Sequence, residues 1–206
     1  MPHPALVIAP LDTQVLQTAA SLENLAVTSY RAADRLAGIK HGGPMLAEFV
    51  ARTSSQHAGH AETFNAALAR AGGRQQHAPD PRYASAVSRA LATRTDAASI
   101  VSILQSLEDL KTQTYTRYAS LSSPGLRRLF VSVAIVEAEH SAFLLAALDL
   151  LTAGPADLLT TSAGLTPAGL GRLPATIGVR AFPHAFYPTA GASAIDEGAV
   201  GTGASR

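Results

Sequence analysis

The 206-residue sequence contains no cysteine and no tryptophan. The absence of cysteine excludes disulfide bonds, thiolate metal sites and cysteine nucleophiles. Charged residues are also scarce, at 15% of the chain, and they sum to a net charge of +1. A basic surface of the kind that binds nucleic acid is therefore not expected, and neither is an acidic tail.

Signals for export and membrane insertion are missing as well. Residues 1–10 lack the basic start and full apolar core of a signal peptide. The most apolar stretch, 129–151, is interrupted by Glu137, Glu139 and His140, so it is not expected to span a membrane. We therefore expect a soluble cytoplasmic protein without a nucleic-acid partner.

Alanine and leucine dominate the sequence and favour helix. Apolar residues recur at helical spacing in four long stretches, each bounded by capping residues, proline or glycine. The predicted helices run from Asp12 or Thr13 to about Lys40, from about Pro44 to Ala71, from Thr95 or Asp96 to about Ser122, and from the junction Ser122-Ser123-Pro124-Gly125 to Gly154-Pro155. Residues 72–95 form the longest connection between them, with room for one short helix around 84–91.

The remaining segment, 155–206, is rich in alanine, glycine, proline and threonine. Apart from a short helix over 155–160, we expect it to lack regular structure beyond turns. Its aromatic residues Phe182, Phe186 and Tyr187 could dock on a surface. The expected organisation is a helical domain over 1–154 followed by an irregular tail over 155–206.

Each predicted helix carries polar side chains within its apolar stripe. These inward-facing residues are Glu23 on the first helix, His57 and His60 on the second, Glu108 on the third, and Glu137 and His140 on the fourth. Residues three apart lie one turn above each other on one face of a helix. At about 1.5 Å per residue, the arms of each hairpin bring these groups to about the same level. Burying several carboxylates together requires a compensating cation or protonation.

The sequence resembles the ferritin-like superfamily, which includes bacterioferritins, rubrerythrins and bacterial ferritin-like domain proteins. The resemblance covers roughly residues 12–154. It rests on four motifs, Leu22-Glu23-Asn24-Leu25, Gln56-His57-Ala58-Gly59-His60, Leu107-Glu108-Asp109-Leu110 and Val136-Glu137-Ala138-Glu139-His140. It implies an all-α, antiparallel ferritin-like four-helix bundle with a long crossover between the second and third long helices.

The resemblance also implies roles for individual residues. Glu23 and Glu108 look like terminal carboxylate ligands, Glu137 like a bridging one, and His60 and His140 like terminal nitrogen ligands. Tyr30 and Tyr115, each seven residues after a glutamate, are expected near the site, either as redox participants or as hydrogen-bond partners of Glu108 and Glu23.

One position departs from the family pattern, because His57 stands where the family has a glutamate. Three carboxylates instead of four leave one positive charge of two divalent cations uncompensated. Three outcomes stay open: a hydroxide or oxide bridge supplies the charge, the site holds one metal, or metal binding has been lost. His57 is then a variable ligand.

The leading functional hypothesis is a metal-binding protein with a carboxylate–histidine site, expected to be di-iron, that oxidises Fe(II) with oxygen or peroxide. Imidazole and carboxylate ligands suit iron or manganese, and zinc would also bind. The alternative is a non-enzymatic structural or interaction module with a metal-free polar core, whose tail binds a protein partner or tethers the domain. Bundles of this type commonly pair, so a homodimer or larger homo-oligomer is expected.

Overall fold

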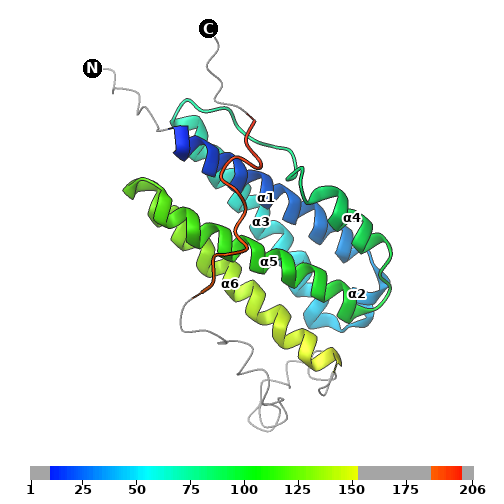
Figure 1. The fold of residues 1–206 in the computed structure, drawn as a ribbon. Coiled ribbons are helices and arrows are strands. Elements are labelled where there is room, and N and C mark those ends of the chain that lie inside the picture. The colour runs from blue at the N-terminus through cyan, green and yellow to red at the C-terminus, as the bar shows by residue number, and fades with distance from the viewer. Residues whose placement is uncertain (1–9, 153–186, 201–206) are drawn as a thin grey trace, which may run out of the picture.

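The computed structural model describes residues 10–152 and 187–200, and the structural statements below concern these residues. They contain helices and no strand. In chain order the helices are α1 (Pro10–Asp34), α2 (Ala37–His41), α3 (Pro44–Arg70), α4 (Ala84–Ala92), α5 (Ala97–Leu121) and α6 (Pro124–Thr152). The four long helices lie side by side along one direction, with the short α2 and α4 beside them (Figure 1). The predicted all-α bundle is confirmed.

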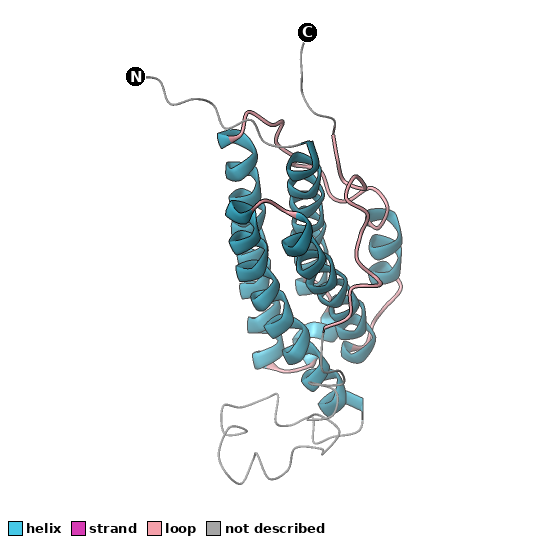
Figure 2. Cartoon of the chain, turned by 60° about the vertical axis from the view of Figure 1, so that its left-hand side comes forward, coloured by secondary structure: helices cyan, strands magenta, loops and turns pink. Residues whose placement is uncertain are grey.

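The long helices form two hairpins, because α1 packs mainly along α3 and α5 mainly along α6. The connection from α3 to α5 contains α4, which packs against α1 and α5. The two hairpins stand next to each other in both ribbon views (Figure 2). The groups that face the bundle axis therefore come from both hairpins.

The helix ends follow from local sequence. Asp96 caps α5, since its side chain accepts a hydrogen bond of 2.8 Å from the backbone N–H of Ser99. Pro44 starts α3 directly after Gly43, whose φ of 109° suits a residue without a Cβ. These starts agree with the predicted ones.

The first predicted helix is interrupted, which corrects the expectation of a continuous helix to about Lys40. α1 ends at Asp34, Leu36 adopts an extended conformation, and α2 then begins at Ala37. At Gly38 the chain passes so close to the start of α5 that an added Cβ would lie 2.5 Å from the carbonyl oxygen of Thr95. The chain therefore turns between α1 and α2, where the sequence pattern continues a helix, and α2 lies close to the residue that precedes Asp96.

The apolar core consists of two separate clusters. One includes Tyr30, Ile39 and Leu104, and the other includes Phe64 and Tyr115. A set of fully buried charged side chains belongs to neither cluster; it comprises Glu23, Glu108, Lys111 and Glu137. The bundle therefore has apolar packing around a buried polar centre.

Residues 187–200 lie across α1 and α5 (Figure 1). As expected, they form no helix or strand, and the Tyr187 hydroxyl docks by donating a hydrogen bond of 2.7 Å to Asp109. Gly198 approaches α1 so closely that a Cβ would lie 1.9 Å from Ser21 Oγ. The expectations for Phe182, Phe186 and a short helix at 155–160 fall outside the described residues.

Helix α6 is long and apolar enough to cross a membrane, with a mean hydropathy of 1.6 in its most apolar window. One face of it is buried in the bundle, where it carries Glu137 and His140. Core helices of globular proteins share these properties. Packing accounts for one face of α6, while Val131 and Ile135 on the same helix are exposed.

Candidate metal centre

All six side chains predicted as ligands come together in the centre of the bundle. Glu23 comes from α1, His57 and His60 from α3, Glu108 from α5, and Glu137 and His140 from α6. Most are completely buried; His60 retains 17% and His140 6% exposure of its side chain. The convergence that was inferred from helix spacing therefore exists in three dimensions.

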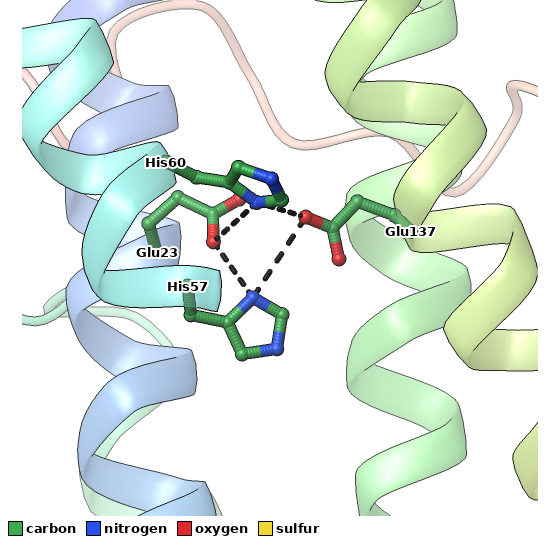
Figure 3. A group of neighbouring side chains, drawn as sticks. All are labelled: Glu23, His57, His60 and Glu137. Atoms are coloured by element: carbon green, nitrogen blue, oxygen red, sulfur yellow. Dashed lines mark hydrogen bonds and ion pairs between the residues drawn. The ribbon is translucent and has the colours of Figure 1, made fainter. Parts of the chain in front are cut away.

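Four of these residues form what we term the first donor group: Glu23, His57, His60 and Glu137 (Figure 3). One oxygen of Glu23 lies 2.9 Å from His57 Nδ1 and 3.7 Å from His60 Nδ1. One oxygen of Glu137 lies 2.8 Å from His60 Nδ1 and 3.8 Å from His57 Nδ1. Ligands at about 2.1 Å from a tetrahedral ion would lie roughly 3.4 Å apart, within this range.

Two donor atoms of the first group lack hydrogen bonds to the described residues. His60 Nδ1 and Glu137 Oε1 are buried and only 2.8 Å apart, but they do not meet in hydrogen-bond geometry. A buried polar atom without a partner is costly and rare. Two donor atoms this close, outside hydrogen-bond geometry, fit ligands that face a shared ion; with His60 protonated they also form an ion pair.

A second donor group consists of His57, Glu108, Glu137 and His140. His57 Nε2 lies 3.2 Å from Glu108 Oε1, and His140 Nδ1 lies 3.3 Å from Glu137 Oε2. His140 Nε2 faces Gln56 at 2.8 Å, which orients the ring so that Nδ1 points to the carboxylates. His57 and Glu137 belong to both groups.

Lys111 extends its ammonium into the second group. Its Nζ donates a hydrogen bond of 2.7 Å to Glu137 Oε2 and lies 3.0 Å from Glu108 Oε2. It also lies 3.0 and 3.3 Å from the two ring nitrogens of His57. Three of the four members of the second group thus already surround a cation that belongs to the protein.

Glu137 presents its two carboxylate oxygens to different neighbours. Its Oε1 faces the first group, 2.8 Å from His60 Nδ1, while its Oε2 faces Lys111 at 2.7 Å. One carboxylate therefore serves two positions for positive charge. The ammonium stands at one of them, and the other is lined by Glu23, His57 and His60.

The electrostatics of the centre favour positive charge. Burial alone would raise the pKa values of Glu23 and Glu108, but Lys111 and the histidines hold both well below the ordinary value. Burial alone would lower the pKa of His57 and of His60, but the surrounding carboxylates raise each to about 9. The same carboxylates outweigh burial at Lys111 and raise its pKa. The buried carboxylates therefore attract any cation that can reach them.

The two predicted tyrosines differ in their contacts. The Tyr115 hydroxyl donates a hydrogen bond to Glu23 Oε1, as one of the two expectations had it. The buried Tyr30 hydroxyl meets no partner in strict hydrogen-bond geometry among residues 10–152 and 187–200, although Glu108 acts on it and its ring lies 4.9 Å from that of His57. Burial and the nearby carboxylates raise the pKa of both hydroxyls, which keeps them protonated.

Lys111 is the functional residue that the sequence-based prediction missed. It follows Glu108 by three residues and precedes Tyr115 by four, so it lies on the same inward stripe of α5. The signal was therefore present in the helical spacing. A lysine on an apolar stripe needs buried negative partners, and the predicted glutamates supply them.

Comparison with known proteins bears on the same part of the chain. A family model described as a ferritin-like domain matches residues 11–150. Searches of curated proteins and of solved structures found no significant match. The matched range contains all six predicted ligands and Lys111.

Proposed function

Because the chain belongs to the ferritin-like domain family, we propose that it binds one divalent transition-metal ion in the first donor group. Glu23, His57, His60 and Glu137 would hold the ion. The observation that carries the proposal is the pair of buried donor atoms without hydrogen bonds, His60 Nδ1 and Glu137 Oε1.

Charge counting agrees with a single ion. The three buried carboxylates carry three negative charges, and the Lys111 ammonium balances one of them. One divalent ion balances the remaining two if the histidines are neutral, as metal ligands must be. Two divalent ions would leave an excess of positive charge in a buried site.

Ligand chemistry limits the identity of the metal. Two imidazoles and two carboxylates suit iron or manganese, and zinc binds the same set. Bound iron or manganese would supply one-electron redox chemistry. Oxidation of Fe(II) by oxygen or peroxide at a di-iron centre stays a prediction, as do redox roles for Tyr30 and Tyr115; Lys111 argues against the second iron.

The residues around the ion would fix which nitrogen of His57 binds it and where the Lys111 ammonium donates its hydrogens. His57 Nε2–H can donate to Glu108 Oε1, which leaves Nδ1 free for the metal. Lys111 Nζ lies 3.0 Å from this Nδ1. Metal binding therefore requires the ammonium to direct its hydrogens to the carboxylates of Glu108 and Glu137 alone.

A second candidate function is the non-enzymatic module with a metal-free core. It is favoured by Lys111, because this ammonium together with protonated His57 and His60 would also balance the three carboxylates. The same protons compete with a metal for the ring nitrogens. The two candidates therefore differ in one measurable property, the metal content of the purified protein.

The test is metal analysis of the full chain, followed by titration of metal-free protein with Mn(II), Zn(II) and, without oxygen, Fe(II). We expect one ion per chain and a rise in thermal stability, about 2.7 kcal/mol at a free metal concentration of 100 times Kd. Glu137→Ala should lose the ion and keep the helix content. Glu139→Gln is the matched control, because Glu139 lies two residues away on α6 and is exposed.

Protein without iron, manganese or zinc, and with thermal stability unchanged by added metal, would favour the metal-free module. Oxygen consumption on addition of Fe(II) tests the oxidation reaction separately. A cytoplasmic location, pairing of two copies and a protein partner for the tail remain predictions. Gel filtration coupled to light scattering checks the pairing.

A further inference from the structure

We propose that Lys111 takes the place of a second metal ion, so that this bundle holds a fixed ammonium beside a single divalent cation. The proposal rests on the proposed function for the first donor group. It assigns to Lys111 the role of limiting metal stoichiometry. It also assigns the second donor group to the protein's own cation.

The geometry of the second donor group carries the argument. Lys111 Nζ lies 2.7 Å from Glu137 Oε2, 3.0 Å from Glu108 Oε2 and 3.3 Å from His57 Nε2. A metal ion bonded to these atoms at about 2.1 Å would fall in the space that the ammonium fills. The ion and the ammonium cannot occupy it together.

Lys111 is also held in this position. Its side chain is completely buried, so leaving the site would place a charge in the apolar core or require the bundle to open. Only two lysines occur in the chain, and the other, Lys40, is exposed on α2. The buried lysine is therefore a specific feature of the centre.

In the first donor group the ammonium approaches one ring nitrogen, His57 Nδ1, at 3.0 Å, and the nearest oxygen of Glu23 is farther away. Lys111 Nζ is 3.8 Å from Glu23 Oε2, and Glu137 presents its other oxygen, Oε1, to His60. Glu137 would thus bridge a metal and an ammonium in the way that a carboxylate bridges two metals. Reactions that require two adjacent metal ions cannot occur in this arrangement, because only one metal position remains.

The experiment is to count bound ions in Lys111→Ala and in the unmodified full chain. Native mass spectrometry of metal-free protein titrated with Mn(II) or Zn(II) gives the stoichiometry. We expect one ion per unmodified chain and two per Lys111→Ala chain, since the substitution frees the second donor group. Lys40→Ala, which removes the other lysine, should retain one ion.

The numbers of bound ions test the role of Lys111 and the proposed function separately. Two ions in the unmodified chain, or one ion in a folded Lys111→Ala chain, would overturn the role of Lys111. No ion in the unmodified chain but one or more in Lys111→Ala would overturn the proposed function and keep the lysine as the blocking group. No ion in either protein would overturn both.

The role of Lys111 stays testable if Lys111→Ala does not fold. Lys111→Met keeps the hydrocarbon stem and removes the charge, and it should admit a second ion. Anomalous scattering from crystals of the unmodified protein soaked in Mn(II) requires no variant. One peak between Glu23 and His60 is expected, and a peak between Glu108 and His140 would contradict the proposal.

Discussion

The two hairpins of the bundle are near-repeats that differ at one decisive position. In α1, Tyr30 follows Glu23 by seven residues, and in α5, Tyr115 follows Glu108 by the same interval. Three residues after the glutamate, however, α1 has a buried alanine, Ala26, whereas α5 has Lys111. A single side chain thus turns a two-fold-like set of ligands into an asymmetric centre.

The second helices of the hairpins differ as well. α3 contributes two imidazoles, His57 and His60, whereas α6 contributes the carboxylate Glu137 together with His140. The α5–α6 hairpin therefore supplies most of the negative charge and its own cation, and the α1–α3 hairpin supplies most of the nitrogen donors. Ligand-like residues at matching positions of the two hairpins therefore differ in charge and in their contacts.

The largest effect is expected from Lys111→Ala in metal-free protein. Removing one partner of a buried ion pair leaves its carboxylates uncompensated, so the free energy of unfolding should fall by about 3–5 kcal/mol. Lys40→Ala, at an exposed position, should change it by less than about 0.5 kcal/mol. Urea denaturation of both variants measures the difference. Equal stability of the two would show that Lys111 compensates no charge.

The next effect compares the equivalent glutamates. Glu23→Gln removes a ligand of the proposed ion, whereas Glu108→Gln changes a residue that contacts Lys111 and His57. Metal affinity should fall by more than about 100-fold in the first variant. It should fall by about 10-fold in the second, because loss of a residue that hydrogen-bonds to a metal ligand typically costs about 10- to 100-fold. Calorimetric titration with Zn(II) measures both. Equal losses of affinity would favour a symmetric centre in which both glutamates are metal ligands.

The histidines allow the same comparison with a smaller contrast. His60→Ala removes a donor of the first group and should weaken metal binding by about 100-fold. His140→Ala removes a member of the second group alone and should weaken metal binding by about 10-fold or less. A competition assay with a coloured zinc chelator resolves such a difference. A larger loss in His140→Ala would place the ion in the second donor group.

The smallest effect is expected at the tyrosines. Tyr115→Phe removes the hydrogen bond to Glu23 and leaves a buried carboxylate oxygen without it, at a cost of about 1–3 kcal/mol in the free energy of unfolding. Tyr30→Phe removes a hydroxyl that meets no partner in strict hydrogen-bond geometry in the described part of the chain and should be neutral or slightly stabilising. Thermal denaturation of the two variants checks the order. The reverse order would show that the Tyr30 hydroxyl has a partner in solution.

Much of the site could be predicted because helical periodicity reports which residues face inward. Glu23, Glu108 and Glu137 lie on apolar stripes in the sequence, and all three are buried in the structure. Lys111 lies on the same stripe as Glu108. A search for metal ligands does not identify it, since an ammonium group is not a metal ligand. Its role as internal cation becomes evident only from distances.

Other features depended on contacts between segments distant in sequence. Gly38, just after the break between α1 and α2, lies close to Thr95, and residues 187–200 dock through hydrogen bonds such as that from Tyr118 to the carbonyl of Ala194. The spacing of apolar residues within one segment does not predict contacts with a distant segment. For this reason the continuous first helix was predicted wrongly.

By itself, the sequence determined four amphipathic helices and the residues that they turn inward, because spacing along one helix depends only on its 3.6-residue period. Only the tertiary structure decided which charged groups are partners. Glu137 faces both donor groups, with Lys111 at one of its oxygens and His60 at the other. The reason is physical. The partner of a buried charge is chosen by distances of about 3 Å across different helices, and such distances are set by the packing of the whole bundle.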